Sequence, residues 1–250
     1  MSSLTGTAFV TGAARRVGRG IALELARRGM DVVVHHRAMD SYAEATAVAA
    51  QCRGLGRRAW VVAAELTDPD AVARLAGAVV AGPGSLDLVV NSASRFERVP
   101  WESLDVAALR RAMAHNVEAP LLVVQALAPL VRDGGAIVNI GDFLATEPVV
   151  AYAAHGASKA ALHHLTRAMA LALAPRLRVN LVVPGTVLPP ADFSEAGLRY
   201  EERRSALGRL GTSEDVADAV AYLYGARFAT GSTVTVDGGR ALTGPRGAQP

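Results

Sequence analysis

The strongest constraint on the fold is an alternation of short apolar runs with longer segments of helical period. The runs are rich in β-branched residues and predict strands at Ala8–Thr11, Val32–His36, Ala59–Ala63, Leu86–Asn91, Ala136–Ile140, Arg178–Val183 and Thr233–Val236. Alanine- and leucine-rich helical patterns fall near residues 18–29, 40–53, 69–80, 103–131, 152–174 and 213–224. This alternation is typical of a parallel sheet covered by helices on both faces. Right-handed crossovers then predict an α/β fold with a doubly wound, seven-stranded parallel sheet.

Length and composition favour one domain without a metal or a disulfide. A chain of 250 residues can bury one substantial core, and we expect a single domain over residues 1–240. The stretch after Gly239 is expected to be loosely ordered, with a C-terminal tail at 241–250. The single cysteine, Cys52, excludes an intramolecular disulfide and a cysteine-built metal site. No secretory signal and no apolar run of about 18 residues is present, so we expect a cytoplasmic protein without a membrane span.

The basic balance of the chain does not predict a nucleic-acid partner. The net charge is +3 and the pI is about 9.4, but the arginines are spread along the chain and form only short pairs. A nucleic-acid surface would need a basic tract, commonly with interleaved aromatic residues, and the sequence has none. We therefore expect the partner to be a small-molecule substrate.

The segment "FVTGAARRVGRGIA", residues 9–22, follows the first strand directly. Thr11 ends that strand, Gly12 permits a tight turn, and Gly18 opens a helix. The amides and the dipole of such a helix can hold a phosphate group. An ordinary strand-to-helix turn is the alternative. The turn predicts a nucleotide site of the Rossmann type, where ligands bind beyond the carboxyl ends of the strands.

The residues after the second strand indicate which dinucleotide is preferred. An acidic residue there would bond the ribose 2′-hydroxyl of NAD, but the chain has His36 and Arg37. A guanidinium matches a 2′-phosphate with two hydrogen bonds, which favours NADPH over NADH. A solvated strand end is the alternative interpretation.

Two further strands also end in chemically informative residues. "LDLVVNSASRF" carries Asn91, Ala93 and Ser94, which would let the chain pass close to a cofactor. Phe96 could stack on a flat ligand or pack in the core. "AIVNIGDFLATEP" presents Asp142, which could orient or protonate a substrate or merely cap a turn.

The helix that contains "AYAAHGASKAAL" carries the only lysine of the chain, Lys159. His155 lies one turn before it, so the two Cβ atoms should be about 5–6 Å apart on one face, with Tyr152 on the same stripe. Lysine is a compact charge whose pKa is easily shifted, whereas arginine stays protonated. The face is either part of an active site or an exposed surface with incidental polar residues.

Taken together, these motifs resemble the short-chain dehydrogenase/reductase superfamily over essentially the whole chain. The matching features are "TGAARRVG", "VNSAS", Asn116 in "AHNVEAP", the helix with Lys159, "RVNLVVPGTV" and "ATGSTVTVDGG". Within the superfamily the chain is most similar to pteridine reductases. Those enzymes carry arginine in place of the middle glycine of the cofactor turn, as at Arg16, and aspartate in place of the catalytic serine, as at Asp142. They also share the His-Arg pair after the second strand, and Phe96 falls where they stack a pterin ring on the nicotinamide.

The resemblance implies NADP(H) as cofactor and a set of site residues. The catalytic group would be His155, Lys159, Asp142 and Asn116. The cofactor-binding group would be Thr11, Gly12, Arg16, Val17, Gly18, His36, Arg37, Glu65, Leu66, Asn91, Ala93, Ser94, Lys159, Pro184, Gly185 and Thr186. The substrate-binding group would be Arg16, Phe96, Asp142, Tyr152, His155, Val187 and Leu188, with residues 186–208 as a variable substrate lid.

The resemblance also implies individual roles. Lys159 would hold the nicotinamide ribose and lower the pKa of the neighbouring acid, and Asn116 would hold a proton-relay water. Arg16 would touch the cofactor phosphate, and Pro184 and Gly185 would support the nicotinamide ring. Helices 103–131 and 152–174 would build a dimer or a tetramer, because relatives use both helices in this way.

One residue departs from the pattern of the superfamily. Tyrosine is expected four residues before the lysine, and this chain has His155. Tyr152 is not a relocated copy, because pteridine reductases carry a tyrosine there in addition to the catalytic one. Histidine titrates near pH 6.5. Lys159 would disfavour the imidazolium and Asp142 would favour it, so His155 is either a general acid or a neutral hydrogen-bond donor.

These features predict an NADPH-dependent reductase that acts on a C=N or C=O bond of a small, flat heterocycle. An imine can arrive already protonated and then needs little from His155, which fits the pterin-like features. Two alternatives stay open. One is a non-redox dehydratase, cyclase or isomerase that uses His155 on the same fold, and the other is a non-catalytic protein that binds the cofactor.

Overall fold

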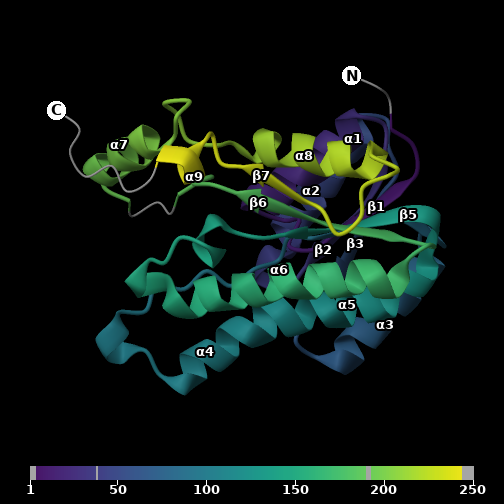
Figure 1. Cartoon of the computed structure of the whole chain (residues 1–250). Coiled ribbons are helices and arrows are strands. Elements are labelled where there is room, and N and C mark those ends of the chain that lie inside the picture. The colour runs from purple at the N-terminus through teal and green to yellow at the C-terminus, as the bar shows by residue number, and fades with distance from the viewer. Residues whose placement is uncertain (1–3, 38, 190–192, 244–250) are drawn as a thin grey trace.

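The computed structural model describes residues 4–37, 39–189 and 193–243 and confirms the predicted fold (Figure 1). One sheet of seven parallel strands has the order β3-β2-β1-β4-β5-β6-β7. The strands are β1 (Thr7–Val10), β2 (Asp31–His36), β3 (Ala59–Ala63), β4 (Leu86–Asn91), β5 (Val131–Ile140), β6 (Arg178–Pro184) and β7 (Thr233–Val236). The strand order reverses between β1 and β4, which is where a doubly wound sheet binds its ligand.

Strand β5 is longer than its apolar pattern predicts. Pairing with β4 begins at Val131, opposite Leu86, and is interrupted by a register shift before Ala136 meets Leu88. The intervening Arg132 and Asp133 are exposed. A prediction from apolar periodicity therefore starts at Ala136, where the strand becomes buried.

Helices cover both faces of the sheet (Figure 1). Their bounds are α1 (Arg16–Arg27), α2 (Tyr42–Gly54), α3 (Pro69–Ala81), α4 (Val106–Met113), α5 (Ala119–Leu127), α6 (Ala153–Leu173), α7 (Glu195–Arg204), α8 (Ser213–Gly225) and α9 (Arg240–Thr243). One hydrophobic core joins the sheet to α1, α2 and α8, and a second joins it to α3, α5 and α6. Both faces of the strands are therefore buried, as their near-continuous apolar sequence requires.

The predicted helix over residues 103–131 is divided in the structure. It begins at Val106 and is interrupted by a π-helical turn at Ala114–Glu118. The helix ends at Leu127, and Val131 already belongs to β5. π-Turns of this kind inside α-helices are often found at functional sites. Here the turn contains Asn116, whose contacts are described below.

Two short helices near the C-terminal end were not predicted. α7 lies inside the segment 186–208 that the sequence marks as a substrate lid, and α9 follows β7. The predicted tail begins at residue 241, but residues 241–243 belong to α9, which starts at the buried and hydrogen-bonded Arg240. Residues 244–250 of the predicted tail lie outside the described part of the chain. Among the described residues no helix is long and apolar enough to cross a membrane.

Candidate active site

A cavity of about 570 Å³ lies at the carboxyl ends of the strands. Its wall contains residues from the turn after β1, from the segments after β4, β5 and β6, and from α6. Ligand pockets in proteins commonly measure about 300–1,000 Å³. The cavity is therefore large enough for a ligand, and it brings together segments that are far apart in the sequence.

The turn after β1 needs glycine at two positions for different reasons. Gly12 has φ +63°, and a Cβ there would lie 3.0 Å from the Ala93 backbone. A Cβ on Gly18 would lie 2.3 Å from the Gly12 carbonyl oxygen. The first turn of α1 contains no acidic residue, so the positive end of its dipole faces the cavity without a competing carboxylate. This combination suits an anionic ligand such as a phosphate.

His35 fixes the position of this turn. Its Nδ1 accepts a hydrogen bond of 3.1 Å from the Gly12 amide, and its Nε2 lies 3.0 Å from the Ala64 carbonyl oxygen. The amide can only donate and the carbonyl can only accept, so the ring is neutral with its proton on Nε2. The pKa of His35 is lowered to about 4, chiefly by burial; the hydrogen bond to the Ala64 carbonyl opposes this shift, and the nearby His36 adds to it.

The structure brings His35, rather than the predicted His36, to the cavity wall. Successive side chains of a strand point to opposite faces, so only one of the two imidazoles can face the Gly12 turn. His36 is buried and packs against Tyr42, with 5.7 Å between the ring centroids. Strand alternation was the sequence signal that could have separated the two histidines.

Two arginines of the cavity wall occupy the positions that the sequence assigns to cofactor contacts. Arg16 has a left-handed backbone, with φ +53°, which is a conformation that favours glycine. Its guanidinium reaches across to the Leu188 carbonyl oxygen, beyond the end of β6. Arg37 lies at the end of β2 with an exposed side chain, and its charge helps to lower the pKa of Glu65 on the same wall.

Thr11 and Asn91 lie behind the wall and hold the segment after β4. The Thr11 hydroxyl accepts hydrogen bonds of 2.9 Å from the amides of Ser92 and Ala93. The Asn91 side chain donates to Asn139 on β5 over 2.8 Å. These contacts fix the backbone of Ala93 close to Gly12, so both residues support the cavity without lining it.

Asn116 organises the surroundings of His155. Its Oδ1 accepts from the Arg95 amide over 2.9 Å, and this contact fixes the orientation of the side-chain amide. Its Nδ2 then donates to the Arg95 carbonyl over 3.1 Å and to the Ser158 hydroxyl over 2.9 Å. Both amide hydrogens are used by these two acceptors. The 3.3 Å approach of Nδ2 to His155 Nδ1 is therefore not needed to satisfy the amide.

His155 and Asp142 face each other at the cavity. His155 is 3% exposed, and its Nδ1 lies 3.0 Å from the Arg95 carbonyl, to which it donates. Its Nε2 lies 3.3 Å from Asp142 Oδ2. With the Nδ1 proton engaged, that contact is attractive only when one of the two facing atoms carries a proton. The two side chains therefore lie within hydrogen-bonding range of each other at the cavity wall.

Lys159 is buried one turn further along α6. Its Nζ donates to the Ile140 carbonyl oxygen over 2.8 Å. Burial lowers its pKa to about 8, and the negative charge of Asp142 opposes part of that shift. Lys159 lines the cavity with His155, so the shared helix face that the sequence predicts is confirmed. Asp142 also caps the turn that follows it, because its Oδ1 accepts from the Leu144 amide over 2.9 Å.

An aromatic pair forms another part of the wall. Phe96 stacks on Tyr152 with 4.6 Å between the ring centroids and an interplanar angle of 28°. The edge of one ring also meets His155, whose ring centroid lies 4.9 Å from that of Phe96. Phe96 is 47% exposed, so it is not a core residue. Val187 and Leu188 line the same cavity.

Most of the predicted site residues meet at this cavity. The predicted residues that line it are Gly12, Arg16, Val17, Gly18, Arg37, Glu65, Leu66, Ala93, Ser94, Phe96, Asp142, Tyr152, His155, Lys159, Pro184, Gly185, Thr186, Val187 and Leu188. Thr11, His36, Asn91 and Asn116 lie behind its wall. Lining residues that the sequence did not name individually include His35, Phe143, Phe193, Glu201 and Arg240. Phe193 and Glu201 lie within the predicted lid at 186–208, and Arg240 directly follows the segment "ATGSTVTVDGG".

Comparisons with known proteins agree with this geometry. An uncharacterized oxidoreductase of Mycobacterium tuberculosis is 39% identical over 241 residues, which cover 93% of this chain and 90% of the relative. The structure of a short-chain dehydrogenase from Burkholderia cenocepacia in complex with NADP has a TM-score of 0.87 and 35% identity, over 94% of this chain and 97% of that chain. A blue fluorescent protein from a metagenomic library, in complex with NADPH, has a TM-score of 0.87 and 33% identity over the same shares.

The chain therefore belongs to the short-chain dehydrogenase/reductase superfamily, a class of oxidoreductases. Within that class, residues 12–241 match the family model described as "Enoyl-(Acyl carrier protein) reductase". The description is that of the family model and names no substrate of this chain.

Proposed function

We propose that the protein is an NADP(H)-dependent reductase that acts on a C=N or C=O bond of a small, flat heterocyclic substrate. The observation that carries the proposal is the meeting of three ionisable groups in one cavity. His155, Asp142 and Lys159 all line a space that begins at the glycine turn of a dinucleotide fold. Two solved neighbours of this chain are complexes with NADP or NADPH.

The residues present fit a dinucleotide phosphate. The glycine turn leaves space for a ligand against its backbone, and α1 begins beside it with the positive end of its dipole and no acidic residue in its first turn. Arg37 supplies an exposed guanidinium at the end of β2, where a ribose 2′-phosphate would bind. Bound NADPH supplies the hydride. The chain itself has to position the substrate, exclude water and deliver a proton.

His155 and Asp142 would deliver that proton. For a C=O substrate, the hydride forms a C–H bond, and the oxygen then takes the proton that the His155–Asp142 pair holds. For a protonated C=N substrate, hydride addition gives a neutral amine, and the pair only orients the ring. The Arg95 carbonyl, which accepts from Nδ1, holds the imidazole in place during either reaction.

Lys159 would act on the cofactor ribose rather than on the substrate. One of its ammonium hydrogens goes to the Ile140 carbonyl, and the group faces the cavity. A buried ammonium is a strong hydrogen-bond donor toward hydroxyl groups in a site of low dielectric constant.

Aromatic residues support a flat substrate. Phe96 and Tyr152 present a stacked pair at the cavity, next to the catalytic imidazole. Stacked and edge-on rings interact with flat ligands through dispersion and quadrupole terms. A pterin-like ring is the narrowest form of this proposal, and a cyclic imine or a related ketone is the broader one.

We also propose that the enzyme forms a homodimer or homotetramer through the predicted helices 103–131 and 152–174, which relatives use in this way.

Single-turnover decay of NADPH absorbance tests the proposal. The purified protein is mixed with NADPH and a panel of pterins, cyclic imines and cyclic ketones, and the products are identified by mass spectrometry. We expect NADPH to be consumed in step with at least one substrate class. Consumption of a substrate at constant NADPH would instead establish a non-redox enzyme. Tight NADPH binding without consumption of any substrate would favour a binding protein.

The His155→Tyr variant tests the proposed proton transfer. Tyrosine restores the acid that the superfamily uses for ketones, so ketone reduction should increase while imine reduction changes little. His164→Tyr is a matched control, because His164 is an exposed histidine of the same helix. If His155→Tyr folds but ketone reduction does not increase, proton supply is not the limiting step and this assignment is wrong.

A further inference from the structure

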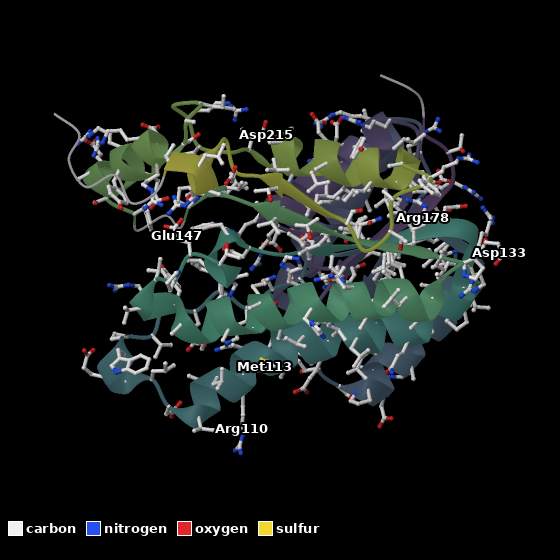
Figure 2. All side chains as sticks on the ribbon, in the orientation of Figure 1. Arg110, Met113, Asp133, Glu147, Arg178 and Asp215 are labelled. Carbon is white, nitrogen blue, oxygen red and sulfur yellow. The ribbon has the colours of Figure 1, made fainter. Side chains whose placement is uncertain are left out.

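Four charged side chains meet beside the cavity in a cluster that the sequence did not predict. They are Glu147 from the segment after β5, Glu201 and Arg204 from α7, and Arg240 from α9. Figure 2 labels Glu147 at the side of the molecule where α7 and α9 lie. We call these four residues the α7 charge cluster. They come from three segments that are far apart in the sequence.

Arg240 is the centre of the cluster. Its Nε and Nη2 donate to the two carboxylate oxygens of Glu147 over 3.1 and 3.0 Å, in the bidentate geometry that arginine favours. Its Nη1 donates to Glu201 and, over 3.2 Å, to the Thr186 hydroxyl. Arg204 adds a bond of 2.9 Å to the same Glu147 carboxylate. One guanidinium therefore joins the β5 segment, the β6 segment and α7.

Arg240 also contacts the neighbour of a proposed catalytic residue. Its guanidinium carbon lies 4.1 Å from the ring centroid of Phe143, in cation–π geometry. Phe143 directly follows Asp142, and its carbonyl accepts from the Glu147 amide over 3.0 Å. The contacts to Phe143 and Glu147 thus hold both ends of the short turn that begins at Asp142.

The cluster is more than a set of surface ion pairs. The side chains of Arg240 and Arg204 are 5% and 7% exposed, and those of Glu201 and Glu147 are 13% and 29% exposed. Surface pairs contribute little and are screened by salt, but a buried, hydrogen-bonded network is screened far less. Two carboxylates balance two guanidiniums, so the network is close to neutral. Breaking one member would leave a buried charge unpaired.

We infer that Arg240 is a positioning residue that couples the turn carrying Asp142 to α7 and so shapes the substrate end of the cavity. Glu201 and Arg240 themselves line the cavity, whereas Glu147 and Arg204 act from behind it. This inference rests on the proposed function, because it takes the space between Asp142 and α7 to be the place of the substrate. The chemistry of the cluster is structural, and no bond forms or breaks in it.

Hydrogen exchange of the free protein, followed by mass spectrometry, tests the coupling without any substrate. We expect Arg240→Met to increase the exchange rate at least about tenfold in both α7 and residues 144–147, with the core strands unchanged. Arg199→Met is the matched control. Arg199 also lies on α7 in an ion pair, but the pair is exposed and has no contact with the cluster. Arg240→Lys keeps the charge without the bidentate fork, so its effect should be smaller.

Kinetics with the best substrate of the panel provide the second readout. We expect Arg240→Met to raise KM for that substrate at least about tenfold while Kd for NADPH changes less than about twofold. Glu201→Gln, which removes one carboxylate but keeps the side-chain shape, should act in the same direction and serves if Arg240→Met does not fold. If no substrate of the panel is turned over, the proposed function is contradicted. The hydrogen-exchange result does not depend on a substrate and still tests the coupling between the two segments.

Three outcomes would overturn the inference. Faster exchange in α7 alone, with residues 144–147 unchanged, would show that Arg240 does not couple the two segments. Equal acceleration in the core strands would show that Arg240 stabilises the whole domain and has no specific positioning role. An unchanged KM in a well-folded Arg240→Met variant would lead to the same conclusion.

Discussion

His35 provides a quantitative test of how the cofactor turn is held. The folded protein keeps this imidazole neutral, because a charged ring could not accept from the Gly12 amide and would be buried. Its pKa falls from 6.5 to about 4. In the unfolded chain His35 binds a proton below about pH 6.5, and in the native state it does so only below about pH 4. Between these values the unfolded state binds more protons, so native stability decreases as the pH falls.

The magnitude follows from the shift. Each pKa unit corresponds to about 1.4 kcal/mol, so His35 contributes roughly 3 kcal/mol that is fully present above pH 6.5 and fully lost below pH 4. At pH 5 the loss should be about 2 kcal/mol. The variant His35→Asn cannot titrate, and its amide oxygen can still accept from the Gly12 amide. Any cavity that this variant creates lowers its stability by the same amount at every pH.

Urea unfolding of both proteins at pH 7.5 and pH 5 isolates this contribution, with tryptophan fluorescence as the signal. The stability difference between wild type and His35→Asn should shrink by about 2 kcal/mol on acidification, because only the wild type loses the His35 contribution. His164→Asn is the control, since His164 is exposed on α6. Parallel pH dependences for the wild type and His35→Asn would refute the assignment of a neutral, acceptor imidazole at the cofactor turn.

Three further predictions use the same assays. Lys159→Met should stabilise the protein by up to about 3 kcal/mol at pH 7, because burial lowers the pKa of Lys159 from 10.5 to about 8. Between pH 8 and pH 10.5 the unfolded state binds more protons, so the wild type gains stability as the pH rises and the advantage of the variant shrinks. Above pH 10.5 the lysine is neutral in both states. Gly20→Ala should cost about 1–3 kcal/mol in urea unfolding, because the new Cβ would lie 2.1 Å from that of Ser213, whereas Gly77→Ala has open space and should stabilise α3 by about 0.5–1 kcal/mol. Arg37→Asp should weaken NADPH binding in a fluorescence titration much more than NADH binding, and an equal effect on both would contradict its assignment to the 2′-phosphate.

The sequence predicts the fold because each layer of the molecule has a strong local signal. Strands β2 and β4 are short apolar runs between helical patterns, and their bounds agree with the prediction to within a residue. The prediction differs from the structure where an element depends on pairing or on backbone geometry that the local sequence pattern does not show. The start of β5 pairs with β4 through the backbone of Val131 and through an ion pair of Arg132 with Asp87, neither of which apolar periodicity registers. The π-turn around Asn116 lies inside a segment that reads as continuous helix.

Site residues can be predicted from the sequence where they belong to a recognisable motif. They cannot be predicted where their role depends on a contact between distant parts of the chain. Lys159, His155 and Gly12 are recognisable because their chemistry or backbone freedom has few substitutes. Arg240 and Glu201 are two of many charged residues in the sequence, and nothing local shows that they meet. Only the path of the chain after β6 and β7 brings them together at the cavity.

Hydrogen bonds on both sides of the ring set the orientation of His155. From the sequence, Lys159 and Asp142 act in opposite directions on the imidazole. In the structure the Arg95 backbone fixes the hydrogen bond at His155 Nδ1. The Arg95 carbonyl accepts from Nδ1, and the Arg95 amide orients the neighbouring Asn116 side chain. The outer nitrogen then faces a carboxylate at 3.3 Å, where the contact is attractive only with a shared proton. Under the proposed function this histidine would supply the proton, and the Arg95 carbonyl would hold its ring in position.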